Sequence, residues 1–239
     1  RAALRRAEEG IDESLPGPIA AGLDAERQSL ELRIEMHAGD RMDIDEAGNR
    51  LGRFLEYGPS MEQHHRARSS VPLAAYLAFF ESAHDARALI EKMLEADALG
   101  RNKLRMLAIL GTVEVRSCRW DRAEYLFEEG RKEAGNLNDV TLIAKFLNNL
   151  GCVQLERGRW QDAERTLQSA ESYYRSTNAR SQWVIDSILN LGNTAFYQLK
   201  ATDARSHYSR IIDAARTLGS LKYEAEARAC LGLLDLLAG

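Results

Sequence analysis

Apolar residues recur at helical spacing between residues 148 and 174. In the second half of this stretch they follow one another at steps of 3, 4, 3 and 4, which places them on one face of a helix with 3.6 residues per turn. An earlier segment carries Leu150 and Gly151, and Gly158-Arg159 separates the two. The stretch is therefore predicted to form two antiparallel helices, the second with an apolar face made of Trp160, Ala163, Leu167, Ala170 and Tyr174.

The same pattern returns along the chain with a fixed period. Twelve residues after each of three Leu-Gly glycines stands an alanine, and four residues after each alanine stands a large apolar residue (Phe127, Leu167 and Tyr208). A constant period in the range of about 20 to 50 residues indicates a solenoid, in which each hairpin buries its apolar face against its neighbours. The Leu-Gly pairs are spaced by 40, 41 and 40 residues: Leu110-Gly111, Leu150-Gly151, Leu191-Gly192 and Leu231-Gly232.

This register predicts four hairpins and one unpaired helix after residue 71. Gly100, Gly135 and Gly219 follow the second helices, where a left-handed residue ends a helix at little cost. All four prolines stand at or before Pro72, so none interrupts the later helices. The predicted hairpins pair residues 72–82 with 84–98, 102–117 with 121–134, 139–157 with 160–174, and 179–199 with 202–218, and the last helix covers 220–237.

Residues 1–70 are the least regular part of the chain. They are predicted to form an N-terminal helical segment, in which residues 24–57 have the weak spacing of a degenerate first repeat. The adjacent His64 and His65 point about 100° apart on a helix, so they favour exposed polar residues over a metal site. The domain organisation expected is therefore a segment over 1–70 followed by repeats over 71–239.

The Leu-Gly of the first helix and the Ala-x3-apolar pattern of the second resemble the tetratricopeptide repeat family. The resemblance covers residues 71–239, and the period of about 40 residues resembles the long-period arrays of kinesin light chains, spindle-orientation scaffolds and bacterial maltose-regulator-like sensors. It implies an all-α fold, a right-handed α-solenoid of antiparallel helical hairpins, with the concave surface lined by the first helices. Because a fold does not fix function, the resemblance leaves the partner open.

Composition narrows the function classes. Hydrophobic residues make up 45% of the chain and charged residues 28%, and the net charge of −4 comes from interleaved acidic and basic residues, a pattern that argues against a nucleic-acid partner. Three cysteines without metal-ligand spacing favour a reduced, cytoplasmic setting. No apolar run approaches the roughly 20 residues that a membrane helix needs. The sequence also begins with Arg1 and without an apolar signal core, as expected for a piece of a longer protein.

Enzyme signatures are absent from the sequence, so no catalytic residue, metal or cofactor is expected. The Leu-Gly pairs lie within predicted helices rather than after strands, which argues against a phosphate-binding loop. Cys118 and Cys152 have no evident histidine partner and are expected to be buried structural residues. Trp120 and Trp160 belong to the apolar stripes, so packing is favoured over a ligand platform.

The candidate binding residues are those that the resemblance places on the concave face of the first helices. Asn149 and Asn190 each stand two residues before a repeated glycine, and an amide can both donate to and accept from the backbone of an extended peptide. The alternative is that these amides bridge neighbouring helices. The family's clamp for a C-terminal carboxylate is not matched, since only Asn149 agrees with it. The full candidate set is Arg105, Thr112, Arg116, Lys145, Asn148, Asn149, Asn190, Asn193, Phe196 and Tyr197.

Two functions remain open from the sequence. The first is a non-catalytic protein- or peptide-binding module, the sensor or scaffold domain of a larger bacterial regulator. The second is a structural array that bridges domains or subunits and binds no separate ligand. The C-terminal helix bears on the second, because Leu233 and Leu236 point away from the predicted packing face of Leu231, Leu234 and Leu237. Self-association through this helix, or further repeats after it, would cover them.

Overall fold

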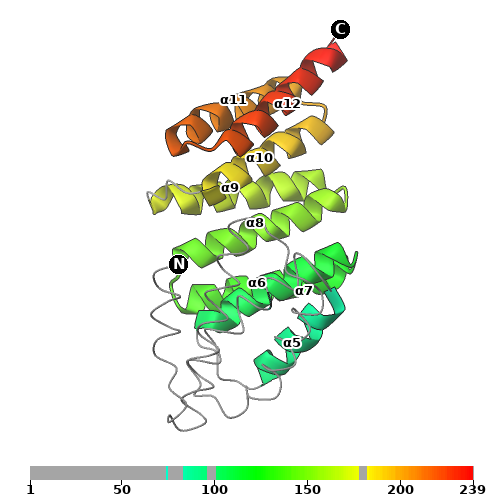
Figure 1. Cartoon of the computed structure of the whole chain (residues 1–239), viewed down its shortest axis with the longest axis vertical. Coiled ribbons are helices and arrows are strands. Elements are labelled where there is room, and N and C mark those ends of the chain that lie inside the picture. The colour runs from blue at the N-terminus through cyan, green and yellow to red at the C-terminus, as the bar shows by residue number, and fades with distance from the viewer. Residues whose placement is uncertain (1–73, 75–82, 96–100, 178–181, 239) are drawn as a thin grey trace, which may run out of the picture. The chain divides into compact units, whose positions relative to one another are not determined.

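The computed structural model describes residue 74 and residues 83–95, 101–177 and 182–238 (Figure 1). The predictions for residues 1–70, for most of the first helix at 72–82, and for His64 and His65 fall outside these residues. The chain divides into two compact units, Arg1–Arg119 and Trp120–Gly239. The described residues contain no strand and form the helices α5 (Ala83–Glu95), α6 (Arg101–Arg116), α7 (Trp120–Asn136), α8 (Val140–Glu156), α9 (Trp160–Ser176), α10 (Gln182–Tyr197), α11 (Ala201–Leu218) and α12 (Leu221–Ala238).

The all-α repeat fold is confirmed, and the helix bounds agree with the predicted ones closely. Gly219 ends α11 in the left-handed conformation, with φ 67°. Gly135, however, lies inside α7, which continues to Asn136. The left-handed residue there is Asn138, with φ 53°, because an asparagine tolerates this conformation better than most residues. The prediction that Gly135 ends the helix was therefore wrong.

In the first unit, α6 packs against α5. Ala86 and Ile90 of α5 are fully buried, as their places in the repeat pattern predict. The nearly buried carboxylate of Glu114 accepts a hydrogen bond of 2.7 Å from Nε of Arg87. This pair fixes the register of α5 against the end of α6.

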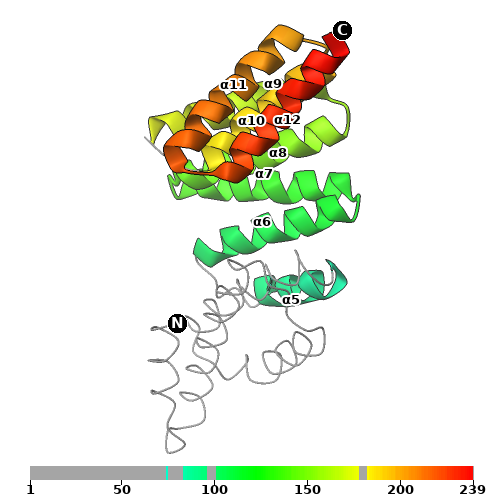
Figure 2. The ribbon, with the colours of Figure 1, turned by 45° about the horizontal axis from the view of Figure 1, so that its top comes forward.

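In the second unit, helices of two kinds alternate along the chain. Helices α8, α10 and α12, here called the first helices, carry the Leu-Gly pairs, and α7, α9 and α11, the second helices, carry the Ala-x3-apolar pattern. Each helix packs on the next along the chain, and α10 also contacts α8 directly. Figure 2 shows α7 to α12 following one another in this antiparallel order. The unit is a stack of helical hairpins whose apolar faces pack on one another.

The repeated glycines make room for large side chains of the second helices. A Cβ added to Gly151 would lie 2.5 Å from Cγ of Leu167, and one added to Gly192 would lie 2.6 Å from Cε1 of Tyr208. Contacts this short are not tolerated, so glycine is required for the helices to approach this closely. The residue that the glycine accommodates is thus the large one of the Ala-x3-apolar pattern.

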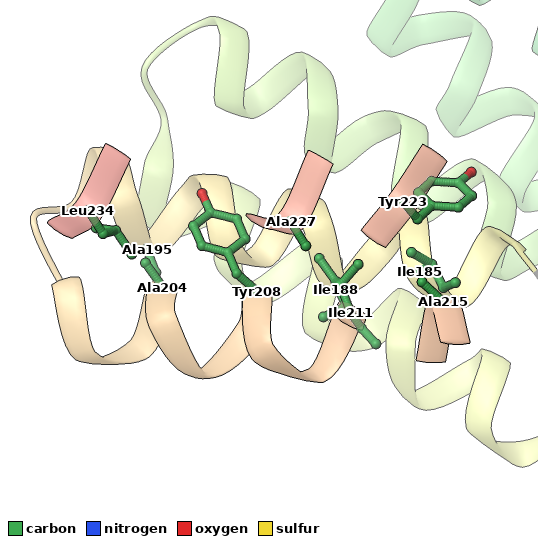
Figure 3. Packing of buried hydrophobic residues seen from close by; sticks show 10 residues of the cluster. All are labelled: Ile185, Ile188, Ala195, Ala204, Tyr208, Ile211, Ala215, Tyr223, Ala227 and Leu234. Carbon is green, nitrogen blue, oxygen red and sulfur yellow. The ribbon is translucent and has the colours of Figure 1, made fainter. Parts of the chain in front are cut away.

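The core between α10, α11 and α12 follows the same pattern (Figure 3). Ala204, Tyr208, Ile211 and Ala215 recur on one face of α11 and are almost fully buried. They pack with Ile185 and Ile188 of α10 and with Tyr223, Ala227 and Leu234 of α12. Trp160 packs against Leu155, Ala163, Leu167 and Leu191, which confirms the packing role predicted for it.

Polar pairs join each second helix of the second unit to the first helix that follows it. The residue after the repeated alanine of a second helix faces the end of the next first helix: Glu164 accepts from Lys200 at 3.0 Å, and Arg205 donates to Asp235 at 2.5 Å. Glu124 likewise accepts from Arg157 at 3.0 Å and pairs with Arg159. Such partly exposed pairs add little stability, but they select the register in which hairpins stack.

Candidate functional site

Five residues of α10 form a surface that the core does not cover. Their spacing of 3, 4, 3 and 4 residues places them on one face of the helix. Trp183 and Tyr197 at its two ends are 43% and 53% exposed, and the three polar residues between them are half-buried. This surface, called the displayed face of α10, consists of Trp183, Asp186, Asn190, Asn193 and Tyr197.

The two aromatic side chains of this face are held in place by other rings. Trp183 stacks on the buried ring of Tyr174 with 6.5 Å between centroids, and Nζ of Lys145 lies 5.8 Å from its ring centre. Tyr197 stacks on Trp160 with centroids 6.4 Å apart and planes 13° from parallel. Both rings therefore keep one face packed, so they offer apolar area to a ligand without much loss of side-chain freedom.

The two asparagines of the displayed face are fixed in opposite orientations. Nδ2 of Asn190 donates to Oδ1 of Asn148 at 3.1 Å and to Sγ of Cys152 at 3.0 Å, which leaves its carbonyl oxygen available. Oδ1 of Asn193 accepts from the Tyr208 hydroxyl at 2.9 Å, which leaves its NH₂ group available. One amide can accept and the other can donate, as the alternating N–H and C=O groups of an extended chain require.

A buried hydrogen-bond network underlies this arrangement. Oδ1 of Asn148 on α8 also accepts from Oγ of the fully buried Ser187, at 3.0 Å. Asn148 therefore bridges α8 and α10, which is the structural alternative that the sequence left open for these amides. Because a buried polar group without a partner is costly, the network also holds Asn190 in its orientation.

Asp186 is the only carboxylate of the displayed face of α10. Its Oδ1 accepts a hydrogen bond of 2.7 Å from the Tyr223 hydroxyl of α12. Burial raises the pKa of Asp186 above its ordinary value, and this outweighs the opposite effects of Tyr223 and Lys222. The folded protein thus binds a proton at Asp186 more tightly than the unfolded chain does.

The stability contributed by Asp186 should depend on pH in a definite direction. It is fully present below the ordinary carboxyl pKa of about 4 and is lost as pH rises through the raised folded-state pKa. Asp186→Asn keeps an oxygen that accepts from Tyr223 and removes the charge. We expect the variant to match the wild type in melting temperature near pH 4 and to exceed it near pH 7. A variant that melts lower at neutral pH would show that the ionised form is favoured in the fold.

The cysteines differ in environment. Burial raises the pKa of the Cys152 thiol to about 12, and the nearby charges of Asp186 and Glu156 act in the same direction. This thiol is therefore protonated at neutral pH and acts as a hydrogen-bond acceptor rather than a nucleophile. Cys118 is exposed, with φ 55°, in the turn after α6. The expectation that Cys118 is a buried structural residue was wrong, because it occupies the left-handed position of that turn.

The remaining candidates from the sequence lie in three kinds of place. Lys145 and Asn149 on α8 precede Asp186 and Asn190 by one repeat, and both are half-buried. Asn149 makes no side-chain hydrogen bond with the described residues, so both functions of its amide are available. Phe196 packs against the core of α10 to α12. Arg105, Thr112 and Arg116 belong to α6 in the other unit, where Arg105 and Arg116 are exposed and the Thr112 hydroxyl donates to the Ala108 carbonyl at 2.9 Å.

Sequence reasoning missed Trp183. The signal was present, because Trp183 continues the spacing of Asp186, Asn190, Asn193 and Tyr197 by one more step of three. Trp120 and Trp160 repeat at a fixed offset, whereas the place of Trp183 is taken by Leu142 and Tyr223 in the neighbouring repeats. A residue that departs from the repeat pattern is the one to examine for a specific role.

The chemistry of this surface is recognition. It offers two flat aromatic rings, amide donors and acceptors, and the carboxylate of Asp186, on which the positive charge of Lys222 acts. Among the described residues, no group of three His, Cys, Asp or Glu side chains is arranged to hold a metal ion. None of the described helices is both long enough and apolar enough to cross a membrane.

The fold is that of a tetratricopeptide-like array, and solved structures share it. BtubC (BKLC) from P. vanneervenii matches with a TM-score of 0.64 and 18% identity over 94% of this chain and 85% of that one. A Rap protein complexed with Competence and Sporulation Factor matches with 0.68 and 13%, over 99% and 70%. NprR in complex with its cognate peptide NprX matches with 0.64 and 16%, over 99% and 65%.

These likenesses, all at low sequence identity, show the fold. The chain covers 65% of the length of NprR and 70% of the length of the Rap protein. No family model matches the sequence, and no curated protein matches it.

Proposed function

We propose that this chain is a non-catalytic module that binds an extended peptide or protein segment across the first helices α8 and α10. The displayed face of α10 is the observation that supports the proposal. Each of its two asparagines uses only one of its two amide groups among the described residues, and both asparagines lie between two exposed aromatic rings. The Rap and NprR structures, each solved with a bound factor or peptide, support it through their shared fold.

The binding would use the backbone and the side chains of the segment differently. Asn190 would accept from a backbone N–H and Asn193 would donate to a backbone C=O, and Asn149 on α8 would extend the row by one repeat. Trp183 and Tyr197 would take apolar or aromatic side chains. Backbone pairing gives affinity and pockets beside it give selectivity, as in other complexes with extended peptides.

The proposal also specifies the type of repeat array and the kind of larger protein that contains the module. The period of 40 to 41 residues supports a long-period tetratricopeptide array, and the module would serve as the sensor or scaffold domain of a larger, cytoplasmic bacterial regulator. In the other unit, taken by itself, Arg105, Thr112 and Arg116 of α6 would be the candidates for a similar surface. The bound segment would shift this regulator between states only if it binds one state better than the other.

The proposal predicts which substitutions weaken binding. A random extended-peptide library would be selected on the chain, and the affinity of the selected peptide measured by calorimetry. Asn149→Ala and Asn193→Ala are each expected to weaken binding by about 1 kcal/mol or more, the net value of a hydrogen bond. Gln168→Ala, on the exposed side of α9, is the control and should leave affinity unchanged.

Two outcomes of this binding experiment would count against the proposed site. If a selected peptide binds the Asn149→Ala and Asn193→Ala variants as tightly as it binds the Gln168→Ala control, its binding site lies elsewhere on the chain. A library that yields no specific peptide would favour the second function, a structural array without a separate ligand. The exposed side of α12 is the observation that bears on that function.

A further inference from the structure

Asp186 is a half-buried carboxylate in the displayed face of α10. Its Oδ1 accepts a hydrogen bond of 2.7 Å from the neutral Tyr223 hydroxyl, and among the described residues no arginine or lysine forms an ion pair with it. Four other half-buried carboxylates of the second unit each form an ion pair with an arginine or lysine: Glu124, Glu164, Glu171 and Glu224. A carboxylate removed from water without an opposite charge is destabilising, so Asp186 departs from the pattern of its unit.

The surroundings of Asp186 compensate its charge only in part. The negative charge acts on three groups of the neighbouring helices: the Cys152 thiol of α8, the Tyr174 hydroxyl of α9 and the Tyr223 hydroxyl of α12. Burial raises the pKa of each of them, so all three keep their protons at neutral pH and stay uncharged. The positive charge of Lys222 also acts on the carboxylate, but its Nζ lies over the Tyr223 ring, 5.4 Å from the ring centre.

Trp183 places an aromatic ring beside the carboxylate. It precedes Asp186 by three residues, so the two side chains are neighbours on one face of the helix. Trp183 is 43% exposed, and its ring already lies 5.8 Å from one ammonium group, that of Lys145. A basic side chain can lay its apolar stem on such a ring while the charge at its tip reaches a carboxylate. This end of the displayed face thus has both parts of a site for a basic side chain.

We propose that Trp183 and Asp186 form a subsite for a lysine or arginine of the bound segment, with the cationic group on the Asp186 carboxylate. The inference rests on the proposed function, in which Asn190 holds the backbone of that segment one helical turn away. The ring of Trp183 then takes the apolar stem of the basic residue. Glu226, exposed at the equivalent place of α12, adds a negative charge that acts on Tyr223. An acidic side chain of the segment is therefore repelled from this end of the surface.

The same residue connects stability with binding. In the free chain, the ionised Asp186 opposes folding, and its replacement by asparagine is expected to stabilise the fold near neutral pH. A cation supplied by a ligand gives the carboxylate the partner that the described residues do not provide. A residue that lowers stability in the free protein and gains its partner on binding is typical of a functional site.

A double-mutant cycle between the chain and a selected peptide tests the proposal. Peptides selected from a random extended-peptide library on the wild type should be enriched in lysine or arginine at one position. Exchange of that residue for methionine, which keeps an unbranched apolar stem, should weaken binding to the wild type about tenfold and binding to Asp186→Asn by no more than about twofold. Asp213→Asn, at an exposed carboxylate of α11, is the control and should show the full tenfold effect.

The outcomes separate this inference from the proposed function. Peptides that depend on Asn149 and Asn193 but carry no enriched basic residue overturn the subsite and leave the peptide surface standing. The same conclusion follows if the methionine exchange weakens binding to the wild type and to Asp186→Asn equally. A library without any peptide that depends on Asn149 and Asn193 overturns both proposals. Melting curves of Asp186→Asn and Asp213→Asn establish that both variants are folded during the binding measurements.

Discussion

Gly151→Leu is expected to lower the free energy of unfolding by about 3 kcal/mol or more, at the upper end of the cost of overpacking. The Cβ alone would lie 2.5 Å from Cγ and 2.6 Å from Cδ2 of Leu167, and Leu167 is fully buried. The neighbouring side chain has no space to move into, so α8 and α9 must separate. Ala163→Leu, at another fully buried position between these helices, is expected to be comparably damaging.

Gly232 supplies a matched control within the same chain. It is the glycine of another Leu-Gly pair, but its Cβ position is open. Gly232→Ala should therefore raise stability by about 0.5–1 kcal/mol through helix propensity alone, whereas Gly151→Ala should lower it. Gln154→Leu should be tolerated, because Oε1 of Gln154 is buried without a hydrogen-bond partner. Chemical denaturation curves in which Gly151 and Gly232 variants shift alike would contradict the assigned packing.

Tyr208→Ala is expected to cost about 3–5 kcal/mol, the usual cost of removing a buried aromatic side chain. The Tyr208 ring lies against Gly192 and is only 2% exposed. Figure 3 shows the ring among the core residues of α10, α11 and α12. Tyr208→Phe keeps the ring and loses the hydroxyl, which donates to Asn193 and also interacts with the Cys230 thiol, so its cost should be about 1 kcal/mol or somewhat more. Thermal and denaturant unfolding of the two variants would separate the packing contribution from the polar one.

A size exchange between these two helices tests the contact itself. Gly192→Leu alone overpacks the interface and Tyr208→Ala alone leaves a cavity, so the double variant should be more stable than the sum of the two losses implies. Residues in direct contact show such coupling, commonly 0.5–3 kcal/mol. Strictly additive losses would mean that Gly192 and Tyr208 do not meet in solution.

The repeat architecture could be predicted because local and long-range signals agree. The Leu-Gly and Ala-x3-apolar patterns are local signals that define each hairpin. Their fixed period along the chain is the long-range signal, because it predicts that equivalent hairpins stack on one another. Trp160, Ala163, Leu167, Ala170 and Tyr174 are placed by that pattern alone. The end of α7 was missed because Gly135 resembles a helix terminus in composition, while the chain turns at Asn138 instead.

The candidate surface was predictable in position but not in detail. The register placed Lys145, Asn149, Asn190, Asn193 and Tyr197 on the surface of the first helices. It could not show that Asn148 bridges α8 and α10, that Asn190 and Asn193 are held in opposite orientations, or that Phe196 packs inward. Those features depend on contacts between residues about 40 positions apart, which a single helix pattern does not contain.

Photo-crosslinking of a selected peptide tests the central claim most directly. A photoreactive benzophenone amino acid would replace Lys145 or Tyr197 on the proposed surface, or Tyr173, which is 40% exposed on α9. If the peptide lies across α8 and α10, as we propose, it should be captured at positions 145 and 197 and not at 173. Capture at 173 without capture at 145 or 197 would contradict the account and place the ligand on the second helices.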